Sequence, residues 1–152
     1  MPNWCRNRVT VFGEPEEIAK VTKIFKDEKS IFDNIIKSPD WRRLPNMKGE
    51  YSKLEQHKNP KTGEVIFETY NFPDGKNDDR WYDWNITNWG TKWDITVKSV
   101  DFGYEDDEQL EMEFETAWAP PEPICNRLRE MFKDLTISWF YDEPGMQTAG
   151  YL

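Results

Sequence analysis

Residues that build metal and redox sites are scarce in this sequence. Its 152 residues include two cysteines and one histidine. Cys5 and Cys125 are too far apart for a metal-binding knuckle, and two cysteines are too few for a disulfide scaffold. His57 lies in a segment rich in lysine and asparagine, which predicts an ordinary surface side chain. We therefore expect two reduced thiols that pack as small apolar side chains, no metal site and no cofactor.

Long hydrophobic runs are also missing. No stretch approaches the roughly 18 apolar residues of a membrane-spanning helix, and the first residues lack the apolar region of a signal peptide. Mean hydropathy is -0.91 and 32% of the residues are charged, so the surface must be densely solvated. The sequence predicts a cytoplasmic protein with no membrane partner, and its length suits one domain spanning residues 1–152.

Basic residues become rare toward the C-terminus. The formal net charge is -9, and residues 101–152 contain thirteen acidic and three basic side chains. The eight carboxylates of segment 101–115, which no basic side chain interrupts, are Asp101, Glu105, Asp106, Asp107, Glu108, Glu111, Glu113 and Glu115. Such a charge field repels nucleic-acid phosphates and favours a partner protein with a basic surface. A turn and strand face that are simply solvated would have the same composition, so the acidic binding surface is a hypothesis.

Motifs that identify an enzyme are absent as well. The sequence has no phosphate-binding loop and no dinucleotide fingerprint. Segment 74–79 has the composition of a calcium loop but lacks the ligand spacing of an EF-hand. A pair of carboxylates could still act as acid and base, yet no spacing singles out such a pair. We therefore predict no catalytic residues and keep a small carboxylate-dependent enzyme as the least favoured alternative.

Hydrophobic periodicity predicts alternating strands and helices. Residues 7–12 alternate apolar and polar side chains, as a half-buried strand does, and Pro15 begins a helix with an apolar stripe. After a long insertion, strands are expected over 93–102, 109–118 and 136–141, with a helix after Pro123 that ends near Asp134. The order βα, insertion, ββαβ is that of a ferredoxin-like α+β sandwich, a split βαβ fold in which two helices cover one face of an antiparallel sheet.

This topology makes the first and third strands neighbours at the centre of the sheet. Arg6 and Arg8 would then lie beside the glutamates of the third strand, on the face away from the helices, where cross-strand ion pairs can form. Nucleic-acid readers with this topology place aromatic and basic side chains on that face. Glutamates at these positions argue against a nucleic-acid partner.

The insertion, at about residues 27–92, is less regular and is treated as part of the same domain. Residues 30–37 could form a short helix, and residues 59–63 a turn between two short strands. A further helix is expected from about residue 78 to Asn88, ended by Gly90 in a left-handed conformation.

Tryptophans are concentrated around the end of this last helix. They can be explained as core side chains that wedge the inserted helix against the sheet, so that truncating Trp89 or Trp93 would strongly destabilise the fold. The alternative is a partly exposed aromatic patch of the kind that forms the hot spot of a protein interface. Its candidate residues are Trp84, Trp89, Lys92, Trp93 and Asp94.

Several motifs together resemble one known family. They are Pro2-Asn3-Trp4-Cys5 with Asn7, Phe32-Asp33-Asn34-Ile35-Ile36, Asn88-Trp89-Gly90-Thr91-Lys92-Trp93-Asp94, Thr116-Ala117-Trp118-Ala119-Pro120-Pro121, and Tyr141-Asp142-Glu143-Pro144-Gly145 with Gly150. In these motifs the chain is similar to the YubB-type ferredoxin-like family of phage and conjugative-plasmid proteins. The resemblance implies a ferredoxin-like fold, an accessory role for a mobile element in a bacterial host, and no established catalytic residues.

Three functions remain open. The favoured one is a non-catalytic protein that binds a basic host protein through its acidic surface and could inhibit a defence nuclease by imitating nucleic-acid charge. The second is a single-stranded nucleic-acid-binding module that uses the tryptophan cluster and the N-terminal basic residues. The third is a small enzyme with a carboxylate centre in the insertion.

Overall fold

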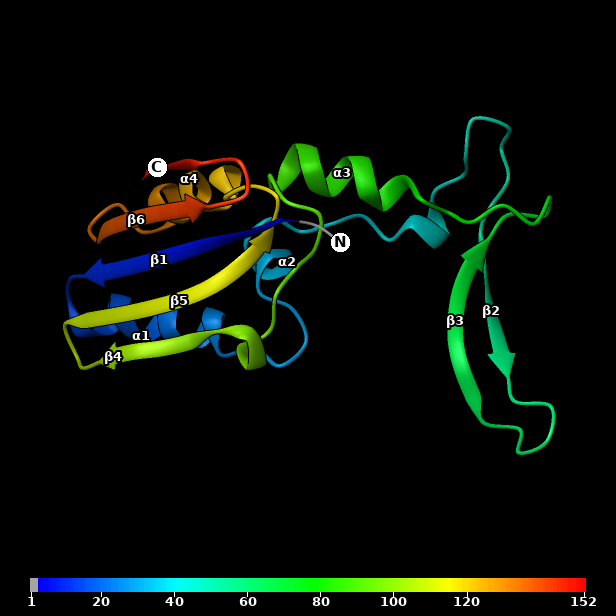
Figure 1. Cartoon of the computed structure of the whole chain (residues 1–152), viewed down its shortest axis with the longest axis horizontal. Helices are drawn as coiled ribbons and strands as arrows, with labels where there is room; N and C mark the ends of the chain where they lie inside the picture. The colour runs from blue at the N-terminus through cyan, green and yellow to red at the C-terminus, as the bar shows by residue number, and fades with distance from the viewer. Residues whose placement is uncertain (1–2) are drawn as a thin grey trace. The chain divides into compact units, whose positions relative to one another are not determined.

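Residues 3–152 are described by a computed structural model (Figure 1). Its elements follow in the order β1 (Trp4–Phe12), α1 (Pro15–Phe25), α2 (Phe32–Ile35), η1 (Trp41–Arg43), β2 (Lys53–Lys58), β3 (Val65–Asn71), α3 (Arg80–Asn88), η2 (Val97–Ser99), β4 (Asp101–Glu105), β5 (Gln109–Ala117), α4 (Glu122–Met131), β6 (Thr136–Glu143) and β7 (Thr148–Tyr151). None of the helices over residues 3–152 is long and apolar enough to cross a membrane. Pro2 of the N-terminal motif lies outside the described residues.

The chain divides into two compact units. Residues 38–83 form one, which we call the hairpin unit, and the remaining described residues form the other, the sheet unit. Both boundaries fall inside the insertion expected at about 27–92. That all of 1–152 behaves as one domain stays a prediction.

The sheet unit has the predicted ferredoxin-like α+β fold. Its strands lie in the order β4-β5-β1-β6-β7, and every neighbouring pair is antiparallel. The split βαβ arrangement is supplied by β1, α1, β4, β5, α4 and β6, with the insertion between α1 and β4. The sequence did not indicate β7, a short edge strand that pairs with β6 after the turn at Pro144-Gly145.

Alternation along the central strands places the core on one side of the sheet. In β5, Met112 and Phe114 are buried whereas Glu113 and Glu115 are exposed. β1 pairs with β5 in antiparallel register from Trp4 to Phe12. The predicted neighbours at the centre of the sheet are thus confirmed.

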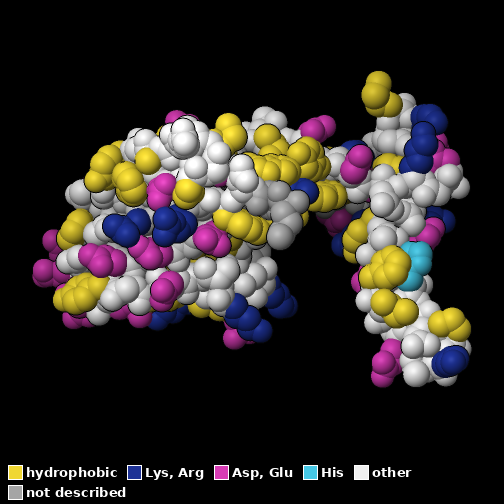
Figure 2. Space-filling model, viewed as in Figure 1, with side chains coloured by type: hydrophobic (Ala, Val, Ile, Leu, Met, Phe, Trp, Pro, Cys, Tyr) yellow, Lys and Arg dark blue, Asp and Glu magenta, His cyan; other side chains and the backbone are white. Residues whose placement is uncertain are grey.

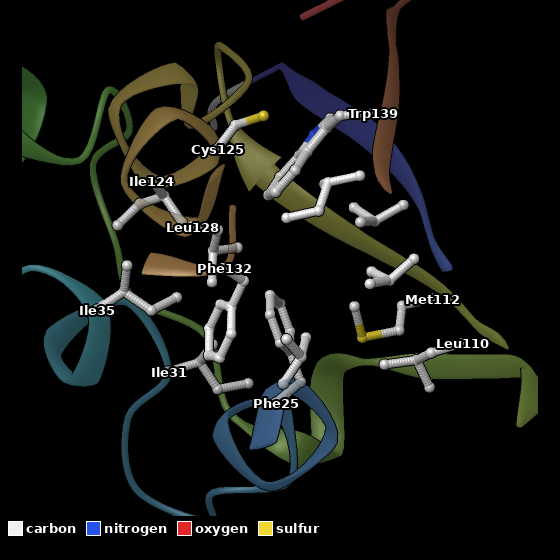
Figure 3. Close-up of a cluster of buried hydrophobic side chains, with 14 of the residues drawn as sticks. Phe25, Ile31, Ile35, Leu110, Met112, Ile124, Cys125, Leu128, Phe132 and Trp139 are labelled. Carbon is white, nitrogen blue, oxygen red and sulfur yellow. The ribbon is translucent and has the colours of Figure 1, made fainter. Parts of the chain in front are cut away.

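Helices α1 and α4 cover the buried face of the sheet and complete the core (Figure 3). Phe25 of α1 and Leu128 of α4 meet Met112 and Trp139 of the sheet, and all four side chains are buried. Burying a side chain of this size contributes about 1.5–3 kcal/mol. The cluster therefore holds the helices against the sheet.

One predicted strand is largely wrong. Residues 93–100 form an irregular segment and the short turn η2, so that β4 begins only at Asp101. Thr96 and Ser99 make a reciprocal capping box at this turn, which bends the backbone out of the extended conformation. The other shifts are small: α2 is shorter than residues 30–37, and α4 ends at Met131.

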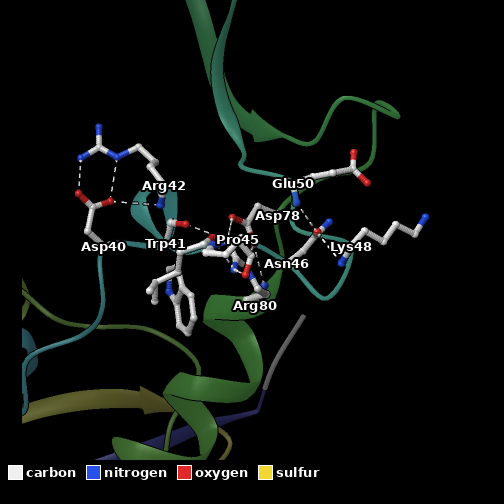
Figure 4. A network of polar contacts seen from close by, with 10 residues as sticks. Asp40, Trp41, Arg42, Pro45, Asn46, Lys48, Glu50, Asp78 and Arg80 are labelled. Atoms are coloured by element: carbon white, nitrogen blue, oxygen red, sulfur yellow. Dashed lines mark hydrogen bonds and ion pairs between the residues drawn. The ribbon is translucent and has the colours of Figure 1, made fainter.

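The hairpin unit contains the antiparallel pair β2–β3 and the turn predicted between them. Arg80 joins the segments on either side of this pair (Figure 4). Its guanidinium lies 2.8 Å from the Asp78 carboxylate and donates to three backbone carbonyls of residues 41–45. The rings of Trp41 and Phe72 lie 5.1 and 5.3 Å from the guanidinium carbon. This arginine is therefore a structural centre of the unit.

Candidate binding surface

The sheet face that points away from α1 and α4 is exposed, and we call it the open face. Arg6 and Arg8 of β1 lie on it, opposite acidic residues of β5 in the strand register. Figure 2 shows basic side chains surrounded by acidic ones over β1 and β5. The open face is therefore a charged surface of mixed sign.

Cross-strand ion pairs form on the open face, as predicted. Arg8 lies opposite Glu113, and its Nε is 2.7 Å from Glu113 Oε1. Arg6 lies opposite Glu115 but pairs with Asp142 of β6, at 3.1 Å between Nη2 and Oδ2. These side chains are at least 35% exposed, so each pair contributes only about 0–1 kcal/mol to stability. Such pairs can be exchanged for contacts with a partner at low cost.

A hollow with a volume of about 550 Å³ lies on the open face. Trp4 and Phe140 contribute aromatic surface to its lining. The charged lining residues are Arg6, Arg8, Asp101, Glu113, Glu115 and Asp142. Carboxylates outnumber guanidinium groups there, so the hollow favours a cationic occupant.

The eight predicted carboxylates do not form one surface, which corrects the expectation from the sequence. Those on the open face are Asp101, Glu111, Glu113 and Glu115, whereas Asp106, Asp107 and Glu108 lie in the β4–β5 turn. A β-bulge in β4 shifts the alternation, and Glu105 points to the helix side, where it pairs with Lys26 at 2.7 Å. In the turn, the Glu108 backbone N–H and the Tyr104 hydroxyl lower the pKa of Asp106. Asp106 thus organises the turn.

The segment after α3 is mostly structural. Trp89 is 5% exposed, and its indole N–H donates to the backbone carbonyl of Ile36 at 2.9 Å. Its ring packs edge-on against Trp84, with centroids 5.5 Å apart. Gly90 has the predicted left-handed conformation, with φ 81°, and a Cβ there would lie 2.8 Å from the Pro123 ring. Trp84 and Trp89 therefore support the core and do not belong to an exposed patch.

Asp94 also has a structural role. Its carboxylate accepts the backbone N–H groups of Phe32 at 2.6 Å, Asp33 at 3.0 Å and Ile95 at 2.7 Å. It thus caps α2 from 62 residues away in the sequence. Burial raises the pKa of the Asp94 carboxyl, and the N–H groups that bind it oppose that rise. Asp94 is a long-range cap, not a member of a binding patch.

Three half-exposed tryptophans and Lys92 form a connected cluster. The ring centroids of Trp4 and Trp93 are 6.1 Å apart, and Lys92 Nζ lies 4.5 Å from the Trp93 centroid and 5.2 Å from that of Trp118. Each indole is 40 to 43% exposed. We call these four residues the aromatic patch. Of the predicted patch it keeps Lys92 and Trp93, and it gains two tryptophans that the sequence offered only as parts of separate motifs.

Trp118 has a backbone conformation that tryptophan seldom adopts. Its φ of 69° lies in the left-handed region, which costs of order 1–3 kcal/mol for a residue other than glycine. The Trp118 backbone N–H donates to the Asn3 carbonyl at 2.8 Å, and the Thr116 hydroxyl donates to the Ala119 carbonyl at 2.7 Å. This corner holds a half-exposed indole at a strained position where glycine would fold at lower cost. Strained residues cluster at functional sites, so Trp118 is a candidate binding residue.

Two acidic residues of the insertion with lowered pKa values are paired with arginines, whereas the backbone N–H groups of Ser30 and Lys29 lower the pKa of Asp27. Arg80 lowers the pKa of Asp78, and Arg42 lowers that of Asp40. Both carboxyls therefore favour the ionised form, whereas a general acid needs a raised pKa. Over residues 3–152, no group of three or more His, Cys, Asp or Glu side chains could hold a metal ion. His57 is exposed and stacks on Phe67 at 4.2 Å between ring centroids.

Both thiols are buried, and their reactivity tests the sheet core. Burial raises the pKa of Cys5 to about 11 and also raises that of Cys125. At about pH 8 both groups are almost entirely protonated, and the thiolate is the reactive form. We expect intact-mass spectrometry to find no iodoacetamide label on the native protein at that pH and two labels after denaturation. Labelling of native Cys5 would contradict the central position of β1.

Comparisons with known proteins bear on the fold. The family model described as "Ferredoxin-like domain in Api92-like protein" matches residues 92–152. The crystal structure of a protein api92 from Yersinia pseudotuberculosis is similar with a TM-score of 0.52 and 12% sequence identity, over 99% of this chain and 93% of that chain. No curated protein matches the chain. Residues 92–152 are thus similar to the ferredoxin-like domain of Api92-like proteins, and the chain as a whole shares the fold of api92.

Proposed function

We propose that this protein is a non-catalytic binding module that engages a basic surface of a partner protein through its open face. The observation that carries the proposal is the hollow, in which Asp101, Glu113 and Glu115 face solvent beside two aromatic rings. Lysine and arginine side chains of a partner would pair with these carboxylates and lie against the rings. Opposite charges of this kind speed association and select the partner.

Mixed charge favours a protein over a nucleic acid as the partner. Both arginines of the hollow already pair with carboxylates, Arg8 with Glu113 and Arg6 with Asp142. A phosphate backbone would have to displace those carboxylates and then remain next to them, at an electrostatic cost. A basic protein surface also meets the two guanidinium groups, but the four carboxylates of the hollow outnumber them, so its net interaction is attractive.

The aromatic patch would supply the hot spot of this interface. Trp4 lines the hollow and also contacts Trp93, so the patch and the open face are continuous. Tryptophan is enriched among residues that dominate binding energy, because it buries a large, rigid surface. The strained backbone of Trp118 supports the same role.

The biological setting belongs to the same proposal. The motifs shared with phage and conjugative-plasmid proteins suggest an accessory protein of a mobile element that acts in the cytoplasm of a bacterial host. A host nuclease offers a basic surface of the required kind, because its substrate is a polyanion. Carboxylates of the open face would then occupy the place of phosphates and inhibit a defence system.

A triple substitution tests the open face. Glu111→Gln, Glu113→Gln and Glu115→Gln together should leave folding almost intact, because exposed ion pairs contribute about 0–1 kcal/mol each. We expect weaker binding of a fluorescent oligolysine probe and slower capture of the host protein recovered with the wild-type chain. The association rate should fall as salt rises, since charges are screened over about 8 Å at physiological ionic strength.

The matched control changes the same number of charges elsewhere. Glu16 of α1, Glu28 and Glu122 of α4 are exposed, belong to the sheet unit and do not line the hollow, so their triple change to glutamine should bind as the wild type does. An equal loss of binding in both triple variants would mean that net charge alone, and not the open face, determines binding. That result would contradict the proposal.

A second candidate function is single-stranded nucleic-acid binding by the aromatic patch. The observation in its favour is that Lys92 lies against Trp93 and Trp118 and that Trp4 contacts Trp93. Arg6 and Arg8 follow Trp4 along β1. Bases could stack on the indoles. Fluorescence anisotropy with labelled oligonucleotides decides between the two: tight binding to bare DNA or RNA at physiological salt, lost in Trp93→Ala, would replace the acidic-surface proposal.

A further inference from the structure

The hairpin unit exposes several large apolar side chains. Leu54, Ile66, Phe67 and Tyr70 are all at least 39% exposed, and Ile66 reaches 64%. Every residue of β2 is exposed. An isolated pair of strands is at best marginally stable in water, and a third strand or a cover is needed for independent stability. The exposed apolar side chains of the hairpin therefore indicate that a further strand pairs with it.

The two edges of the hairpin differ. Along the outer edge of β3, Asn71 bridges to Asn77, and the Asp78 backbone N–H donates to the Tyr70 carbonyl at 2.7 Å. Within residues 3–152, β2 pairs only with β3. The outer edge of β2 therefore presents unpaired backbone groups, which template the addition of a strand.

The sequence of β2 is complementary to itself in an antiparallel register about Leu54. When two copies pair about a twofold axis at Leu54, Lys53 of each copy lies opposite Glu55 of the other. Moving the axis to Glu55 would place two carboxylates opposite each other, and a register that opposes Lys53 with Lys58 would pair two cations. A register that opposes Glu55 with Lys58 also forms two ion pairs, but it places Gln56 and His57 at the centre. The Leu54 register combines two ion pairs with a central leucine pair and is therefore favoured.

We propose that a second copy of this chain occupies the β2 edge, so that two hairpins form one four-stranded β3-β2-β2-β3 sheet. Within one copy, Leu54 lies opposite Tyr70 in the register of β2 and β3. In the dimer the row across one face reads Tyr70, Leu54, Leu54 and Tyr70, which removes apolar surface from water on both copies. The β2 edge belongs to the hairpin unit and the open face to the sheet unit, and different residues carry them, so the two proposals are tested independently.

Charge exchange on the full-length protein tests the register. Sedimentation equilibrium should find a species of twice 18.2 kDa for the wild type. K53E places glutamates opposite Glu55, and E55K places lysines opposite Lys53, so each should weaken dimerisation by about tenfold. The double variant K53E/E55K restores both pairs with their signs reversed and should dimerise as the wild type does. Because Glu55 also accepts a hydrogen bond from Asn71 at 2.7 Å, K53E is the cleaner single change.

Disulfide trapping gives an independent measurement. In the proposed register Leu54 of one copy lies opposite Leu54 of the other. The Cα atoms of residues paired in this way are about 4.5–5.5 Å apart, a distance that a disulfide can span. L54C should therefore form a covalent dimer on mild oxidation, whereas Q56C, which lies two residues from the axis, should not. Cys5 and Cys125 are buried and do not compete.

Several results would overturn the proposal. A wild-type chain that stays monomeric at every concentration would do so. A dimer that K53E does not weaken, or that K53E/E55K fails to restore, would place the contact elsewhere. Equal trapping of L54C and Q56C would also exclude the register. Far-UV circular dichroism of each variant checks that the fold is kept, so that a loss of dimerisation can be attributed to the interface and not to unfolding.

Discussion

Replacing Trp89 with alanine should lower the free energy of unfolding by about 3–5 kcal/mol, as truncation of a buried large aromatic side chain does. The indole is 5% exposed, and it contacts Phe32 and Trp84 edge-on, at 6.2 and 5.5 Å between centroids. Its removal leaves a cavity between α2 and the segment after α3, and it leaves the Ile36 carbonyl without the indole donor. Urea denaturation followed by far-UV circular dichroism measures the change.

Two variants separate the causes of this loss. Trp89→Phe keeps an aromatic ring but removes the indole N–H, so we expect a smaller loss than with alanine. Trp93→Ala is the matched control, because Trp93 is 40% exposed and should cost about 1 kcal/mol. The sequence alone predicted a large loss of stability for both substitutions. Because Trp89 is buried and Trp93 is half-exposed, we now expect the large loss only for Trp89→Ala. If Trp93→Ala proved as damaging as Trp89→Ala, the aromatic patch would be a structural cluster and not a binding surface.

The fold was predictable because its signals are local. Val9 and Val11 alternate with polar residues in β1, Met112 and Phe114 alternate with glutamates in β5, and two apolar stripes mark α1 and α4. Period-two and helical patterns depend only on which face of an element is buried, so they are visible in a single sequence. The order of these elements was then enough to indicate the ferredoxin-like topology.

The errors occurred where long-range contacts decide the backbone. Residues 93–102 have strand composition, but Asp94 binds the N-terminus of α2 and draws the segment out of an extended conformation. The bulge in β4 turned Glu105 toward Lys26, which split the acidic stretch between two sides of the sheet. Neither contact has a local signature. The prediction of the aromatic patch was incomplete for the same reason, because Trp4 contacts Trp93, and Trp118 contacts Lys92, only in the folded chain.

Replacing Asp94 with alanine should destabilise the protein by about 2–4 kcal/mol, because each partly buried N–H left without an acceptor costs about 1–3 kcal/mol. Four backbone N–H groups donate to this carboxylate, those of Ile31, Phe32, Asp33 and Ile95, and that of Ile31 also donates to the Ile95 carbonyl. Asp106→Ala is the matched control: Asp106 accepts two backbone N–H groups in an exposed turn, where water can replace it, and should cost no more than about 1 kcal/mol. Urea denaturation compares the two variants.

The pH dependence of Asp94→Asn tests whether burial governs this carboxyl. Burial raises the pKa of Asp94 in the folded state, so folding takes up a proton at this site, and the contribution of Asp94 to stability falls as the pH rises through the raised pKa. Asparagine does not titrate. The stability difference between the wild type and Asp94→Asn should therefore be larger at about pH 3 than at about pH 7, while the other carboxyls cancel in the comparison. A difference that instead grows toward neutral pH would mean that the backbone N–H groups outweigh burial and that the ionised carboxylate is the form that caps α2.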